Sequence, residues 1–264
     1  MHKKYPILVI VIILSIIISV QKSEAQLIYT TGHADIGVAY EDGNLVAHWH
    51  GTVSGGSAWN LPEAEYAPDE VVAQVGATRA SASNSASYLG VATGSQIYVA
   101  GLINFQPWLG FGAEELAGAD WNGDLVIKLT DWVVPENGNF AMYTTNNVGT
   151  VTGDIYLSTY NPSATNDPWG LDMGPNVFGI GVGGHDHYTF GFTEGGHYEI
   201  TLEFSGTHVT DGAKSVTATF GFDVIPEPST YASVLIGALA LFFFYRNRAI
   251  DPNCRSISKA SFFK

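Results

Sequence analysis

The chain has 264 residues, a formal net charge of −14 and a single cysteine, Cys254. The region from residue 26 to 225 holds 22 acidic residues but only three basic ones, so its net charge is about −19. That charge excludes ordinary binding to the phosphate backbone of nucleic acids and favours the attraction of cations. A disulfide within this region is also excluded, although about 200 residues suffice for a core without one.

The first 25 residues have the pattern of a secretory signal peptide. A basic start precedes an apolar run over Tyr5–Val20. Ser23 and Ala25 then supply the small residues at positions −3 and −1 that cleavage after Ala25 requires. We expect signal peptidase to remove residues 1–25 on export. Because the apolar run is long for a cleaved signal, an uncleaved membrane anchor is the alternative.

The mature region, residues 26–224, is predicted to be an all-β domain, an antiparallel β-sandwich. Runs rich in Val, Ile, Tyr, Phe and Thr are separated by clusters of Gly, Asn, Asp and Pro, a pattern typical of such folds. Apolar and polar residues alternate along Tyr198–Phe204, as a half-buried strand requires. The expected strands are Leu45–His50, Gln96–Gly101, Asp124–Leu129, Phe140–Thr144, Gly153–Thr159, His187–Phe192, His197–Ser205 and Ser215–Val224.

The connections between these strands are of two kinds. Asp42-Gly43 and Glu136-Asn137-Gly138 have the residues of tight hairpin turns. The stretch Trp108–Ala119 shows no regular alternation, so we expect a loop or a short helix there. The stretch Asn161–Phe178 is rich in Pro, Asn, Asp and Gly, which indicates a long exposed loop of the kind that often carries function.

Two pairs of histidines have a spacing that favours joint action. His48 and His50 are two apart in an expected strand, and His185 and His187 are also two apart. Side chains two apart on a strand point to the same face of the sheet. If the opening strands and the strand of His185 are neighbours, the two pairs converge with His33 and Asp35.

Such a convergence predicts a metal site. Neutral imidazole nitrogens together with a carboxylate suit zinc, and also copper, iron or nickel. The acidic domain helps to hold a divalent cation. The alternative is that these histidines are surface or hydrogen-bonded structural residues. The candidate ligands are His33, His185 and His187 as first choice, followed by His48, His50 and Asp35.

Exposed tryptophans offer a second hypothesis, a module that binds extracellular polysaccharide. Aromatic rings beside Asn and Asp side chains stack on the apolar faces of sugars. The alternative is that the tryptophans fill the core of a domain without disulfides. The residues concerned are Trp59, Trp108, Trp121, Trp132 and Trp169.

Two acidic stretches suggest a calcium site and a glycosidase, respectively. Asp120–Asp124 has oxygen ligands at alternate positions, as a calcium loop does, but lacks the closing Glu, so a turn held by side-chain hydrogen bonds is favoured. Glu114 and Glu115 offer half of a glycosidase pair, but adjacent residues on an extended chain point apart. With no nucleophile motif and no usable cysteine, we expect a protein that is not an enzyme.

The C-terminal part has the pattern of a sorting signal. Pro226-Glu227-Pro228 precedes an apolar stretch, Tyr231–Tyr245, that Arg246 and Arg248 end. Fifteen helical residues span about 22 Å, short for a bilayer core of about 30 Å. The segment 225–248 resembles the PEP-CTERM signal of Gram-negative bacteria, which implies processing by an exosortase. The alternative is a plain single-pass anchor.

Several short motifs are spread along the mature region. They are Gly32-His33-Ala34-Asp35, Tyr88-Leu89-Gly90, Pro107-Trp108-Leu109-Gly110 and His185-Asp186-His187 with the following Phe192-Thr193-Glu194-Gly195-Gly196-His197-Tyr198. In these motifs the mature region resembles the choice-of-anchor M surface domain. The resemblance implies a β domain at the cell surface, without enzymatic activity, related to proteins associated with metal-type transporters. It agrees with the presence of a sorting segment, since that family varies in its anchors.

Together these features predict an exported, non-catalytic protein of the cell envelope or the extracellular matrix. Signal peptidase and an exosortase are the expected processing partners. The inner membrane is expected to hold the chain only transiently, through Tyr231–Tyr245, with the arginines and the tail 249–264 on the cytoplasmic side.

Overall fold

The structure is a computed structural model that describes residues 25–52, 58–101, 106–145, 151–166, 170–171 and 173–226, together with residues 237, 239 and 241. The chain divides into two compact units, Met1–Val224 and Ile225–Lys264. The expected signal peptide up to residue 24, the sorting residues Glu227, Pro228, Arg246 and Arg248, and the tail 249–264 lie outside the described residues. In the described part of the chain, no helix has both the length and the apolar character needed to span a bilayer.

The described part of the first unit is all-β, as predicted, and its strands form three sheets. Sheet A has the order β1 (Leu27–Tyr29), β4 (Val71–Val75), β15 (Gly212–Val224), β14 (Gly196–His208), β8 (Leu125–Val133) and β11 (Val177–Ile180). Sheet B has the order β12 (His185–His187), β7 (Trp108–Gly112), β2 (His33–Glu41) and β3 (Asn44–Gly51). Sheet C has the order β10 (Val151–Ser158), β9 (Phe140–Thr145), β13 (Thr189–Phe192), β6 (Gln96–Ala100) and β5 (Thr78–Ala80). Short helical turns are α2 (Ser85–Tyr88), η2 (Gly118–Asp120) and η3 (Pro162–Ala164).

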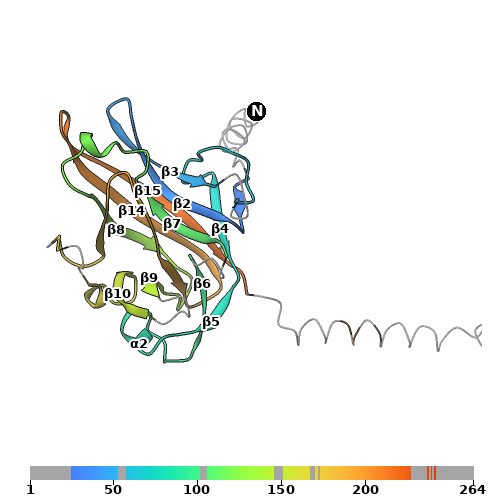
Figure 1. Cartoon of the computed structure of the whole chain (residues 1–264). Helices are drawn as coiled ribbons and strands as arrows, with labels where there is room; N and C mark the ends of the chain where they lie inside the picture. The colour runs from blue at the N-terminus through green and yellow to red at the C-terminus, as the bar shows by residue number, and fades with distance from the viewer. Residues whose placement is uncertain are drawn as a thin grey trace, which may run out of the picture. The chain divides into compact units, whose positions relative to one another are not determined.

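Sheets B and C both pack against one face of sheet A, an arrangement consistent with a β-sandwich. Trp49 of sheet B meets Phe220 of sheet A with ring centroids 5.3 Å apart. Phe190 of sheet C lies 5.9 Å from Phe222 of sheet A. In Figure 1, β2, β3 and β7 overlie β14 and β15, whereas β9, β10 and α2 lie at the lower end. The core is therefore built largely from aromatic side chains that meet between the layers.

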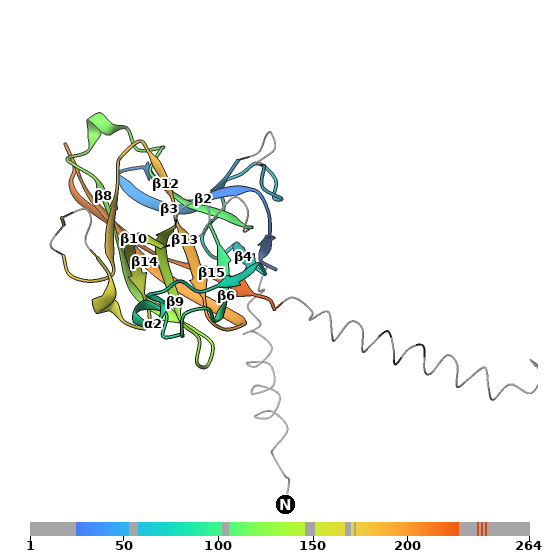
Figure 2. The same cartoon turned by 60° about the horizontal axis from the view of Figure 1, so that its bottom comes forward.

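A change of sheet at Tyr188 joins sheets B and C. Strand β12 pairs with β7 in sheet B, whereas β13 pairs with β6 and β9 in sheet C. The prediction of one strand over His187–Phe192 is therefore wrong, because Tyr188 interrupts it. The alternation of apolar residues does not reveal such a switch, since both halves keep the period of a strand. Figure 2 shows β12 at the upper end of the domain, away from α2 and β9.

The pairing is not purely antiparallel, contrary to the prediction. Three of the described pairs are parallel, namely β1 with β4, β4 with β15, and β2 with β7. Parallel neighbours need a long connection. Between β2 and β7 the chain passes through sheets A and C before it returns to sheet B.

The two predicted turns have different roles. Asp42 and Gly43 adopt positive φ angles of 47° and 81° and link β2 to β3 as a two-residue hairpin turn, as predicted. This turn fixes the register that places Asp35 opposite His50. Asn137 also has a positive φ, 62°, but its turn links β8 of sheet A to β9 of sheet C, so that connection is not a hairpin.

The predicted loop over Asn161–Phe178 is only partly a loop. It contains η3, and at its end Phe178 is fully buried in β11. Asn176 is also buried, because its side-chain amide pairs with the backbone of Ser158 through both its oxygen and its nitrogen. The prediction that this stretch is exposed is therefore wrong at Asn176. From sequence alone, an asparagine whose amide is buried and hydrogen-bonded to the backbone looks the same as an asparagine in an exposed turn.

Candidate metal centre

The site lies on the outer face of sheet B. Successive residues of β2 point to opposite faces of the sheet. Ala34 and Ile36 belong to the core between the layers, so His33, Asp35 and Gly37 point to the other face. The face of sheet B that turns away from sheet A therefore carries the polar residues of the candidate site.

The register of sheet B aligns these residues with the two histidine pairs. The neighbours across the sheet form two rows that run from β12 through β7 and β2 to β3. The first row is His187, Gly110, Asp35 and His50, and the second is His185, Gly112, Gly37 and His48.

Glycines in the middle of the rows make room for the histidines at their ends. A Cβ at Gly110 would overlap Asp35 Oδ1 and lie 2.8 Å from His187 Nδ1. A Cβ at Gly37 would lie 2.5 Å from His48 Nε2. Glycine is a weak strand former and often marks a close approach by another group. Gly110 and Gly112 explain why the strand in Trp108–Ala119 is missed, since its first five residues form β7. The rest of that stretch is a loop that leads into η2, as predicted.

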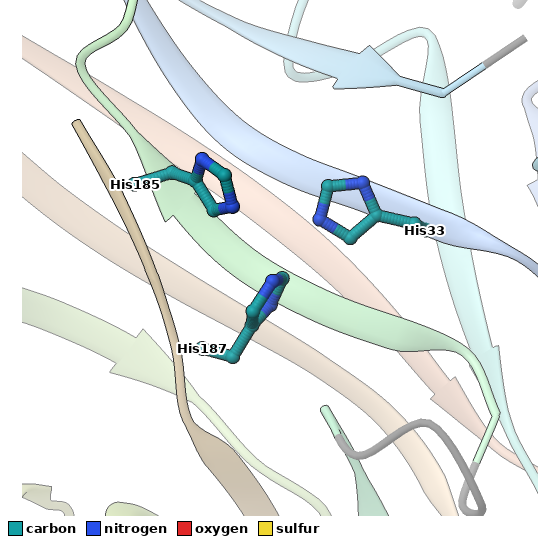
Figure 3. Close-up of side chains that lie close together, drawn as sticks. All are labelled: His33, His185 and His187. Carbon is teal, nitrogen blue, oxygen red and sulfur yellow. The ribbon is translucent and has the colours of Figure 1, made fainter. Parts of the chain in front are cut away.

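Three imidazoles converge at one end of this face. His33 of β2 and His185 and His187 of β12 each offer a ligand nitrogen, and these atoms lie within 4.8 Å of one another. Figure 3 shows the three rings turned toward a common centre. The structure therefore brings together the three residues that are the first choice as metal ligands from the sequence.

An oxygen atom contacts Nδ1 of each ring, which leaves Nε2 as the free ligand atom. Carbonyl and carboxylate oxygens accept hydrogen bonds, so the rings of His185 and His187 donate through Nδ1 and keep a lone pair on Nε2. This is how metal-binding histidines are held in proteins. The contacts are His185 Nδ1 to Glu114 Oε1 at 2.6 Å, His187 Nδ1 to Leu109 O at 3.3 Å, and His33 Nδ1 to Thr52 Oγ1 at 2.7 Å.

Burial keeps two of these rings neutral. Burial, with a smaller effect from the nearby His187, lowers the pKa of His33 to about 4. Burial also lowers the pKa of His187 below its usual value. Because a metal binds only the neutral imidazole, neither ring has to release a proton at neutral pH before it binds a cation.

Trp108 packs against the same rings. Its ring centroid lies 4.7 Å from that of His33 and 4.8 Å from that of His187. A side chain packed in this way limits the rotamers of both histidines, which favours a rigid ligand set. Trp108, singled out as a sugar-stacking residue, therefore belongs to the wall of the histidine site.

A second group lies at the other side of the face. Glu115 Oε1 is 3.0 Å from His48 Nε2 and 3.2 Å from His50 Nδ1. His48 is only 3% exposed, whereas His50 is exposed. The three ligand atoms again lie within 4.8 Å of one another. The five histidines thus form two groups instead of a single cluster.

Asp35 lies between the two groups. The residue is 4% exposed, and Oδ1 has no hydrogen-bond partner among the described residues. Its Oδ2 is 3.5 Å from His33 Nε2, and it forms a further ligand-type group with Glu114 and His185. Burial raises the pKa of this carboxyl to about 7, against an opposing effect of His185. A bound cation would compensate this buried carboxylate.

Glu114 and Glu115 are the site residues that sequence reasoning missed. The sequence suggests them only as half of a glycosidase pair, and they do point apart as expected of adjacent residues. Each instead contacts a histidine group on its own side, Glu114 at His185 and Glu115 at His48 and His50. An acidic pair directly after a strand of the site is the signal that would have indicated them.

The other candidate features lie elsewhere. Trp59 and Trp121 are buried in the core, which favours the structural alternative for both, and Trp132 is only partly exposed. Trp169 lies outside the described residues. Within the described ranges, Asp120 and Asp124 join no group of three ligand-type side chains.

Comparisons with protein-family models, curated proteins and solved structures give no match to this chain. The two resemblances found in the sequence, to PEP-CTERM sorting signals and to the choice-of-anchor M domain, stay predictions.

Proposed function

We propose that this chain is an exported, non-catalytic surface protein whose β domain binds a divalent metal ion, with zinc as the first candidate. The observation that carries the proposal is that His33, His185 and His187 each offer a ring nitrogen within 4.8 Å of the other two, while an oxygen atom contacts Nδ1 of each ring. Three neutral imidazoles are a common ligand set for zinc and leave one position for a further ligand.

The charge around the site supports the binding of a cation. The three basic residues of the described domain, Arg79, Lys128 and Lys214, lie on β5, β8 and β15, outside sheet B. Among the described residues, the ion-pair partners of the site carboxylates Asp35, Glu114 and Glu115 are histidines. A site with excess negative charge attracts and holds a metal ion more strongly than a balanced one.

The predicted ends of the chain support the location. A signal peptide over residues 1–25 would export the domain, and Pro226-Glu227-Pro228 would direct it to an exosortase. The mature domain would then act at the cell surface or in the extracellular matrix. A metal site without cysteine ligands suits such an oxidising location, because histidines and carboxylates are not oxidised there.

Replacement of single ligands tests the proposal. We expect His33→Gln, His185→Gln and His187→Gln each to weaken zinc binding at least about 10-fold, since each removes one of three ligands. The measurement is a titration of the purified protein against a zinc-binding dye. His197→Gln is the matched control, because His197 lies on sheet A beside Asp223 and Glu199. If all four variants bind zinc like the parent, the proposal is wrong.

A further inference from the structure

The group of His48, His50 and Glu115 has the features of a second ligand set. It combines two imidazole nitrogens and a carboxylate oxygen, a set that suits zinc, copper or nickel. The nitrogen-to-oxygen distances of 3.0 and 3.2 Å are those of atoms that share a tetrahedral cation, with bonds of about 2.0 Å to each. His48 Nδ1, on the buried side of its ring, has no hydrogen-bond partner among the described residues.

Asp35 lies in the row between the two groups, with its carboxylate on the side of the first. On β2 it lies directly across from His50 on β3, and across from Gly110 on β7. Gly110 has no side chain, so nothing in this row stands between the carboxylate and His187 on β12. Of the two oxygens, Oδ2 faces His33, and Oδ1 is buried without a partner in the described part of the chain.

A buried carboxylate oxygen without a partner indicates a missing ligand. Such an oxygen costs free energy unless a hydrogen bond or a cation compensates it. The groups whose charges act on Asp35 include His185 and Glu114, and Glu114 repels its negative charge. Neither Lys nor Arg of the described domain lies on sheet B. The first cation would compensate both oxygens, since Oδ2 faces His33 and Oδ1 lies over Gly110 beside His187, which leaves Glu115 as the carboxylate of the second group.

We propose that the outer face of sheet B binds two divalent cations, the second between His48, His50 and Glu115. The first cation is the one at His33, His185 and His187, so this inference rests on the proposed function. The glycines of the two rows serve both ligand sets, because ligand side chains occupy the space that a Cβ at Gly37 or Gly110 would fill.

The number of zinc ions per chain tests the proposal directly. The full-length protein carrying Cys254→Ser, which removes the sole thiol, is stripped with a chelator, reloaded with zinc and measured by elemental analysis. We expect two zinc ions in this parent and one in Glu115→Gln or in His48→Gln/His50→Gln. His197→Gln is the control and should retain two, because it lies on sheet A.

The outcomes separate the two proposals. One zinc ion in the parent, lost in His33→Gln but retained in Glu115→Gln, overturns the second site and leaves the proposed function intact. Two zinc ions that Glu115→Gln does not reduce also overturn it. No bound zinc in the parent overturns the proposed function and this inference with it.

Discussion

Asp35 has opposite effects on the metal-free and the metal-bound protein. Its pKa is raised from 3.8 to about 7 in the folded state. For an acid whose pKa is raised on folding, the unfolded state loses its proton first. The folded metal-free protein therefore loses stability as pH rises from about 4 through about 7, and the cost is complete above that range. A bound cation reverses this dependence of stability on pH, because it binds the charged form of the Asp35 carboxyl.

We expect Asp35→Asn to stabilise the metal-free protein at about pH 8, on the order of 1 to 4 kcal/mol, and to change little at about pH 4. The same variant should bind zinc more weakly. Urea unfolding in the presence of a chelator at both pH values, followed by a zinc titration, measures the two effects. An equal change in stability at both pH values would show that the Asp35 carboxylate is not the titrating group.

Residue types and spacing predict the ligands but not their partners. His33, His185 and His187 are identifiable because histidines two apart on a strand share a face. Thr52 and the carbonyl of Leu109, which contact the Nδ1 atoms, carry no such signal. A backbone carbonyl becomes a ring-orienting group only through the register of β7 against β12, which is a property of the folded sheet.

At the scale of the strand, Gly110 decides whether the site has space. Atoms of Asp35 and His187 occupy the space that a side chain at Gly110 would need. Alanine at a typical strand position is more stable than glycine. Here the extra methyl group instead has to displace ligand atoms, and overpacking of this kind costs about 1–3 kcal/mol.

We therefore expect Gly110→Ala to lower the free energy of unfolding by about 1–3 kcal/mol and to weaken zinc binding. Gly181→Ala is the matched control, since a Cβ there would meet nothing within 4 Å and should leave both quantities nearly unchanged. Urea unfolding and zinc titration of the two variants give the comparison. A Gly110→Ala protein as stable and as tight a zinc binder as the parent would refute the role of this glycine.

The strand pattern and the turn chemistry predict the all-β class and the hairpin of β2 and β3. Long alternating runs such as Tyr198–Phe204 give the clearest signal, and the Asp42-Gly43 turn sets the register of that hairpin. The parallel pairing of β2 with β7 could not be predicted, because strands far apart in the chain become neighbours only through the packing of the layers. The switch at Tyr188 has the same origin.

At the scale of the whole domain, the net charge of about −19 over residues 26–225 acts on every approaching cation. Part of the attraction comes from carboxylates beyond the site, and salt screens these distant charges. We expect the zinc affinity to fall about 3- to 10-fold as a salt without zinc-binding ions rises from about 0.05 to about 0.5 M. Titrations along this series measure the slope. A zinc affinity that does not change with salt would show that the carboxylates beyond the site do not contribute to binding.

The position of a bound metal ion is the most direct test of the three-histidine site. Crystals of the zinc-loaded protein, with diffraction data collected on both sides of the zinc absorption edge, locate the ion by its anomalous scattering. We predict a peak about 2.0–2.1 Å from Nε2 of His33, His185 and His187. Zinc held elsewhere, or zinc-loaded crystals with no peak on the outer face of sheet B, would contradict it.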